Sequence, residues 1–114
     1  MVKFTIPIKL PSLANLRVHY WGMARIKKGQ RKKTKSAMKE LVLPHLPVIV
    51  TITRLGPRRL DDDNLASACK YVRDQIAAEI GVDDGSPLYT WVYLQRTGKY
   101  SVEVEITPRS STNC

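Results

Sequence analysis

The sequence has few cysteines, no long apolar run and almost no acidic residues in its first half. Its two cysteines, Cys69 and Cys114, are too few for a disulfide framework or a cysteine-based zinc site. Even the longest uninterrupted apolar runs are short, such as residues 48–50, so we expect no membrane-spanning segment. The first residues lack the apolar core and cleavage site of a signal peptide, and we therefore expect a cytoplasmic protein.

The sequence does contain enough apolar residues for one small domain. It has 114 residues, of which 43% are hydrophobic and 25% charged. This balance allows a buried core and is not typical of a disordered chain. We expect a single domain over residues 1–107, followed by a polar tail at 108–114.

Positive charge is concentrated in the first half of the chain. Residues 1–60 carry 14 Lys and Arg and one acid, a net charge of +13, whereas residues 61–114 carry 5 basic and 9 acidic residues, a net charge of −4. The overall charge of +9 indicates a polyanionic partner, nucleic acid before an anionic membrane. A membrane surface is disfavoured because no basic amphipathic helix with a large apolar face is evident. We expect phosphate contacts from Arg17, Arg25, Lys27, Lys28, Arg31, Lys32, Lys33, Lys35, Arg58 and Arg59.

Hydrophobic periodicity predicts alternating strands and helices. Strands are predicted at 2–9, 47–55, 88–96 and 99–107, the last two joined in a hairpin at Thr97-Gly98. Helices are predicted from about Lys32 to Pro44 and, without a break, over 64–80, with Gly81 ending the second one. The order β-α-β-α-β-β favours an α/β fold of the α+β two-layer type, with a mixed sheet and helices on one face.

Five of the nine acids in the second half form two tight groups, Asp61 to Asp63 and Asp83-Asp84. The first group follows a strand and opens a helix, where one carboxylate favours the helix dipole but a third adds mutual repulsion. Carboxylates beside an asparagine are also the oxygen ligands that Mg²⁺ or Mn²⁺ prefers. In a basic protein, such an ion would bridge to phosphate and activate water for phosphodiester hydrolysis. The second group, taken alone, is typical of a β-turn.

These residues resemble a known family. The segment Asp61-Asp62-Asp63-Asn64-Leu65, then Lys70 and Asp74, then Val82-Asp83-Asp84, is similar to RusA-type Holliday-junction endonucleases. Pro11 to Arg17 loosely matches a further element of that family. The likeness covers about residues 5–106 and is specific over 58–84.

The resemblance implies a RusA-like homodimer that cuts four-way branched DNA in a bacterial or phage-infected cell. It implies Mg²⁺, with Mn²⁺ as a substitute, bound by Asp61, Asp63 and Asp84, and a functional lysine at Lys70. The lysine departs from the family pattern, because it lies seven residues beyond Asp63 rather than four. An alternative role for Lys70 is to pair with Asp74 or Asp63 on a solvated helix face.

Chain length adds a geometric expectation. An unbroken helix over 64–80 would be about 25 Å long, and the four residues after it reach at most about 14 Å. Asp84 would then not easily join Asp61 and Asp63 of its own chain, and we expect it to reach the site of a partner subunit. The sequence thus predicts a Mg²⁺-dependent endonuclease that makes paired nicks in four-way junctions during recombination or repair. The alternative is a non-catalytic nucleic-acid-binding protein in which the acids cap a helix.

Overall fold

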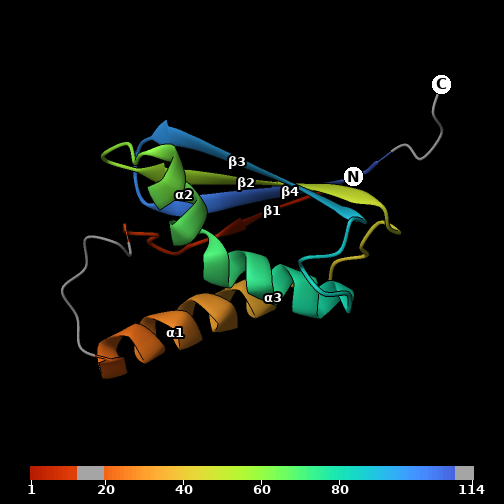
Figure 1. Ribbon diagram of the computed structural model, residues 1–114, viewed down its shortest axis with the longest axis horizontal. Coiled ribbons are helices and arrows are strands. Elements are labelled where there is room, and N and C mark those ends of the chain that lie inside the picture. Colours follow the sequence, from red (N-terminus) through yellow and green to blue (C-terminus); the bar gives the residue numbers. More distant parts are fainter. Residues whose placement is uncertain (13–19, 110–114) are drawn as a thin grey trace.

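A four-stranded sheet with three helices makes up the computed structural model, which describes residues 1–12 and 20–109 (Figure 1). In chain order the elements are β1 (Val2–Ile6), α1 (Tyr20–Met38), β2 (Val48–Gly56), α2 (Asp62–Ala68), α3 (Lys70–Ile80), β3 (Tyr89–Thr97) and β4 (Ser101–Pro108). None of these helices is long and apolar enough to cross a bilayer.

The sheet is mixed, with the strand order β1-β4-β2-β3. Strand β2 runs parallel to β3 and antiparallel to β4, which is also antiparallel to β1. Helices α1 and α3 form a second layer against one face of the sheet, and α2 lies near the end at which β2 and β3 finish (Figure 1). The expected α+β fold with a mixed sheet is therefore confirmed.

The predicted hairpin at Thr97-Gly98 is wrong. Strands β3 and β4 are consecutive in the chain, but β2 lies between them in the sheet. The connection crosses the end of β2, where the Gly98 amide donates to the Gly56 carbonyl at 2.9 Å. The parallel pairing of β2 with β3 follows from the helical connection between them, which short-range turn signals cannot reveal.

The core lies between the sheet and the helices. Alternate residues of the central strands are buried, among them Val50 and Ile52 of β2 and Val104 of β4. They pack with Val72 and Ile76, which α3 contributes at a helical spacing of four. Among the residues that the structure describes, no helix covers the other face of the sheet (Figure 1).

The first predicted helix is corrected at both ends, because α1 begins at Tyr20 rather than near Lys32 and ends at Met38, before Pro44. Its buried stripe is partly polar: Gln30, Thr34 and Met38 are buried at a spacing of four. The Thr34 hydroxyl donates to the Gln30 carbonyl at 2.8 Å, which satisfies it inside the protein. A search for apolar periodicity misses a stripe of this kind.

The second predicted helix is also corrected, because it breaks at Cys69 into α2 and α3. The Cys69 amide is shared between the Leu65 and Ala66 carbonyls, both at 3.2 Å. The break lets α2 contact β3 while α3 packs against α1. The predicted end is confirmed: Gly81 adopts φ 90°, a left-handed conformation that suits glycine.

Candidate functional site

The first acidic group lies at the start of α2, beside the end of β2. Asp61 is the N-cap residue, yet its side chain makes no capping hydrogen bond. Asp61, Asp62 and Asp63 are all exposed, and none is ion-paired with any residue in the described ranges. Helix capping therefore does not account for the Asp61 carboxylate.

Two buried or half-buried side chains hold the loop that carries these acids. Arg54 of β2 donates from Nη1 to the Arg58 carbonyl at 2.9 Å. Gln95 of β3 makes two bonds to Leu60, accepting from its amide at 2.9 Å and donating to its carbonyl at 2.8 Å. Because Leu60 directly precedes Asp61, these bonds fix where the acidic segment begins. Sequence reasoning missed both positioning residues, since they come from strands whose register only the fold reveals.

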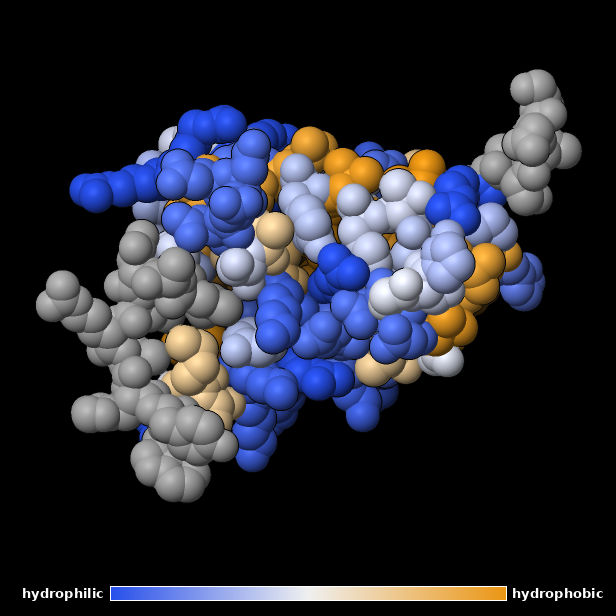
Figure 2. All heavy atoms as spheres, in the orientation of Figure 1, coloured by the Kyte–Doolittle hydropathy of each residue, from blue (hydrophilic) through white to orange (hydrophobic). Residues whose placement is uncertain are grey.

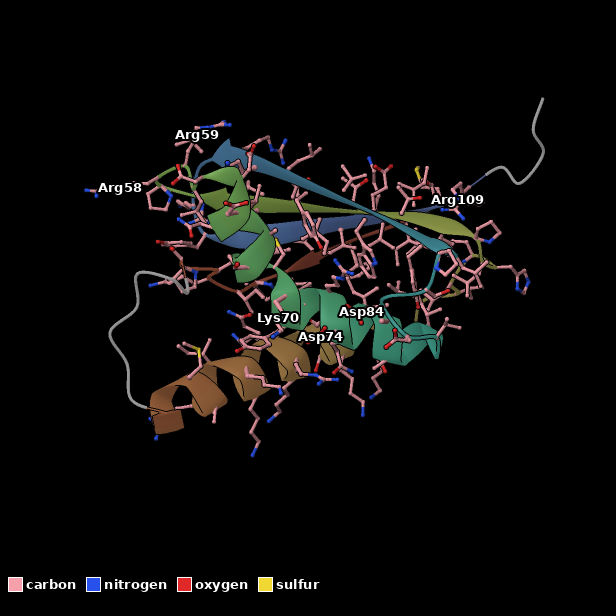
Figure 3. The ribbon with its side chains drawn as sticks, viewed as in Figure 1. Arg58, Arg59, Lys70, Asp74, Asp84 and Arg109 are labelled. Atoms are coloured by element: carbon pink, nitrogen blue, oxygen red, sulfur yellow. The ribbon has the colours of Figure 1, made fainter. Side chains whose placement is uncertain are left out.

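Arginines surround the acidic segment. Arg58 and Arg59 are exposed at this end of the molecule (Figure 3). Arg59 and Asp62 line a cavity of about 380 Å³, which Arg96 of β3 also lines. Arg96 is ion-paired with Glu103 of β4. Arg96 is a further candidate for phosphate contact, and no pattern in the sequence distinguishes it.

Asp84 has a defined structural environment. Its Oδ2 accepts from Arg73 Nε at 2.9 Å, and its backbone carbonyl accepts from Trp91 Nε1 at 3.0 Å. Arg73 also donates to the Tyr93 hydroxyl at 2.7 Å and stacks 4.8 Å from the centre of the Trp91 ring. Trp91 and Tyr93 thus face the helices, pack against the core and fix the Arg73–Asp84 pair.

The pKa values of the neighbours reflect this cluster. Burial lowers the pKa of Arg73, but the Tyr93 hydrogen bond and the Asp84 charge outweigh it, so the pKa is raised overall. Burial, followed by the charges of Asp84 and Asp83, raises the pKa of the Tyr89 phenol. Both shifts reflect how close Arg73 and Tyr89 lie to Asp84.

The structure does not bring Asp84 to the first acidic group of the same chain. Asp84 follows the far end of α3, away from Arg58 and Arg59 (Figure 3). It lines a separate open cavity of about 450 Å³ with Asp74 and Asp83. Asp83 forms the expected turn, because its Oδ2 accepts from the Gly85 amide at 3.0 Å. Across residues 1–12 and 20–109, no group of three or more His, Cys, Asp or Glu is placed to hold a metal ion.

Lys70 is the first residue of α3 and is exposed. It forms no ion pair with Asp63 or Asp74 in the part of the chain that the structure describes, so no contact supports the alternative role as an ion-pair partner. Figure 3 shows Lys70 and Asp74 along the same helix, between Arg58 and Asp84 in this view.

The basic residues of α1 face outward, and hydrophilic side chains cover much of this helix in Figure 2. One exception is half-buried Arg31, whose Nε donates to Gln75 Oε1 of α3 at 2.9 Å. Lys27 lies 5.9 Å from the centre of the Tyr71 ring. Arg17 and most of the segment from Pro11 to Arg17 lie outside the described residues. The exposed members are Arg25, Lys27, Lys28, Lys32, Lys33 and Lys35.

Comparison with other proteins adds no assignment. No protein-family model matches this chain, and no curated protein shows significant similarity to it.

Proposed function

We propose that this protein is a Mg²⁺-dependent endonuclease that cuts branched DNA, with four-way junctions as its substrate. The observation that carries the proposal is the unexplained acidic segment in a strongly basic protein. Asp61, Asp62 and Asp63 are exposed, lack ion-pair partners among the described residues, and include an N-cap whose side chain caps nothing. Three adjacent carboxylates repel one another and repel DNA unless a cation lies among them.

Asp61 and Asp63 would hold the metal, since carboxylate oxygens are the ligands that Mg²⁺ prefers. Bound there, the ion would supply Lewis-acid stabilisation of the scissile phosphate and a more acidic water. Arg58 and Arg59 flank the acids in the sequence and would orient the phosphate next to them. Lys70, exposed at the start of α3, is a candidate for neutralising charge on the leaving group.

The third ligand, Asp84, is proposed to come from a partner subunit. Its distance from the acidic segment along α2 and α3 supports sharing across a two-fold axis. Arg73 holds one of its carboxylate oxygens, Oδ2, and would keep the carboxylate oriented while the other oxygen binds the ion. A symmetric pair of sites would suit a four-way junction, in which two strands must be cut.

A second candidate function is a nucleic-acid-binding protein without catalytic activity. The pairing of Asp84 with Arg73 favours it, because that contact gives Asp84 a structural role of its own. The two functions make the same prediction for DNA binding and differ only in cleavage.

A labelled synthetic four-way junction with and without Mg²⁺ separates them. We expect paired, symmetric nicks that require Mg²⁺ or Mn²⁺. Asp61→Asn and Asp63→Asn should each lower the cleavage rate at least about 100-fold, since loss even of residues that orient metal ligands costs about 10–100-fold. Asp62→Asn is the matched control, with the same charge change at an adjacent exposed residue, and should keep most of the activity. A gel shift with no Mg²⁺-dependent cleavage would establish the binding protein instead.

A further inference from the structure

A third cavity, of about 670 Å³, lies apart from the acidic residues and has no role in the function proposed above. It is formed by the chain just after β1, by one side of α1 and by the β3–β4 connection. Its volume falls within the range of about 300–1,000 Å³ that is typical of ligand sites. The residues that line it are Pro7, Ile8, Lys9, Pro11, Arg25, Ile26, Gly29, Gln30, Lys33 and Tyr100.

The charged residues of this cavity are all cations. Lys9, Arg25 and Lys33 line it, and no acidic residue of the described ranges does. None of the three is ion-paired within the described ranges. Lys9 Nζ lies 5.0 Å from the centre of the Tyr100 ring, and the Arg54 guanidinium lies 5.8 Å from it. Positive charge gathered without a counter-charge indicates an anionic ligand.

The rest of the lining is apolar, aromatic or amide. Pro7, Ile8 and Ile26 offer an apolar wall, and Tyr100 is 37% exposed, so its ring is accessible for stacking. Gln30 is 5% exposed, and its Oε1 has no hydrogen-bond partner among the described residues. A buried acceptor without a donor is costly, and an N–H group of a ligand would satisfy it once the Gln30 amide turns toward the cavity. An aromatic base with N–H donors, carried on a phosphate, has these properties.

The cavity is linked to the loop that carries the acids. Arg54 is 2% exposed and bridges the two regions, donating to the Leu10 carbonyl at 2.6 Å and to the Arg58 carbonyl at 2.9 Å. A Cβ at Gly56 would lie 2.8 Å from Arg54 Nη2, so only glycine leaves room for this guanidinium. The segment after β1, the β3–β4 connection and the start of α2 lie at the same end of the molecule (Figure 1).

We propose that this cavity binds one unpaired nucleotide of a DNA strand, with the base against Tyr100 and Gln30 and the flanking phosphates on Lys9, Arg25 and Lys33. The proposal rests on the proposed function and names what the protein recognises in branched DNA: a base that has lost its partner. Stacking on an aromatic ring suits any base, so recognition would depend on the unpaired state more than on sequence.

Gly29→Leu tests the proposal by filling the cavity. Gly29 lines the cavity on α1, and a Cβ there would meet no other atom within 4 Å, so the larger side chain is compatible with the fold. Affinity is measured without divalent cations for two duplexes, one with a single unpaired 2-aminopurine nucleotide and one fully paired. We expect Gly29→Leu to weaken binding of the first about tenfold and to leave the second unchanged. Lys28→Ala, on the same helix but outside this cavity, should weaken both equally.

A second variant keeps the test valid if Gly29→Leu does not fold. Tyr100→Leu should abolish the quenching of 2-aminopurine fluorescence on binding, and Tyr100→Phe should restore it. The cavity assignment is overturned if Gly29→Leu and Tyr100→Leu retain the wild-type preference and quenching. It is also overturned if free deoxynucleoside monophosphate competes as well as the oligonucleotide does. If the wild type binds no DNA at all, the proposed function fails as well. If the wild type cleaves DNA with Mg²⁺ but both variants keep the wild-type binding preference and quenching, only the cavity assignment is refuted.

Discussion

Cys69 marks the break between α2 and α3, and its thiol is fully buried. Burial raises its pKa from 9.0 to about 12, and the charge of Arg54 opposes that rise only in part. The folded state therefore holds the thiol proton more tightly than the unfolded chain does. The stability that this contributes is complete below pH 9 and is lost as the pH rises toward about 12.

Cys69→Ala should remove this loss of stability at alkaline pH. In the wild type the thiol should lower the free energy of unfolding by at most about 1.4 kcal/mol per pH unit in that range. The variant should be less stable at neutral pH, because it leaves a small void, but its free energy of unfolding should decline less steeply. Urea unfolding at a series of alkaline pH values measures both slopes. Tyr89, whose pKa is also raised, titrates in both proteins and so contributes equally to both slopes. Equal slopes of unfolding free energy against pH in the two proteins would contradict the assignment of the alkaline loss to Cys69.

Asp84 shows what sequence can establish for a single residue. The turn at Asp83-Asp84-Gly85 was predictable, because aspartate and glycine favour that geometry wherever they occur together. The partner of Asp84 was not predictable, because Arg73 lies eleven residues away on a helix. Aromatic residues of β3 also contact Arg73 and hold it in place. Contacts of this kind depend on the packing of separate elements.

Helix α1 is the element on which sequence and structure differ most. Its apolar pattern starts only in the second half of the helix, because the polar residues Gln30 and Thr34 occupy the buried face. A hydropathy pattern scores both residues as polar and so does not identify them as buried. The strands were predicted to within a few residues, since alternation in β2 and β4 follows directly from burial of one face. Strand order was not predictable from local signals, because nothing in the turn at Gly98 indicates that β2 lies between β3 and β4.

The exposed basic face of α1 predicts DNA binding of a particular kind. Lys28→Glu combined with Lys32→Glu should weaken binding to duplex, fork and four-way junction alike, because phosphate contacts carry no information about shape or sequence. The dependence of log Kd on log salt concentration should become shallower by about one for each phosphate that the variant no longer neutralises. Titrations at several salt concentrations measure both effects. Lys3→Glu, on the edge strand β1, is the control and should change neither; a weakening confined to the junction would contradict this role for α1.

At the scale of the whole molecule, charge and chemistry are divided between regions. The acids of α2 and the cavity beside Tyr100 share one end, whereas Asp84 follows the opposite end of α3 (Figures 1 and 3). One chain thus carries each part of the proposed metal site but does not assemble it, and within the described residues no three ligands meet. A two-fold axis that brings α2 of one subunit to the 81–86 turn of another would complete two sites at once.

Mixing two inactive variants tests this sharing. Homodimers of Asp63→Asn and of Asp84→Asn should both be inactive on a four-way junction. Heterodimers would contain one site in which both carboxylates are replaced and one in which both are intact, so subunit exchange should restore nicking of one strand but not of both. If each site were built within one chain, every site in the mixture would lack one ligand, and mixing would restore nothing. Asp63→Asn mixed with Asp61→Asn is the control, because both changes fall in the same half of the site and no combination of those subunits makes it whole.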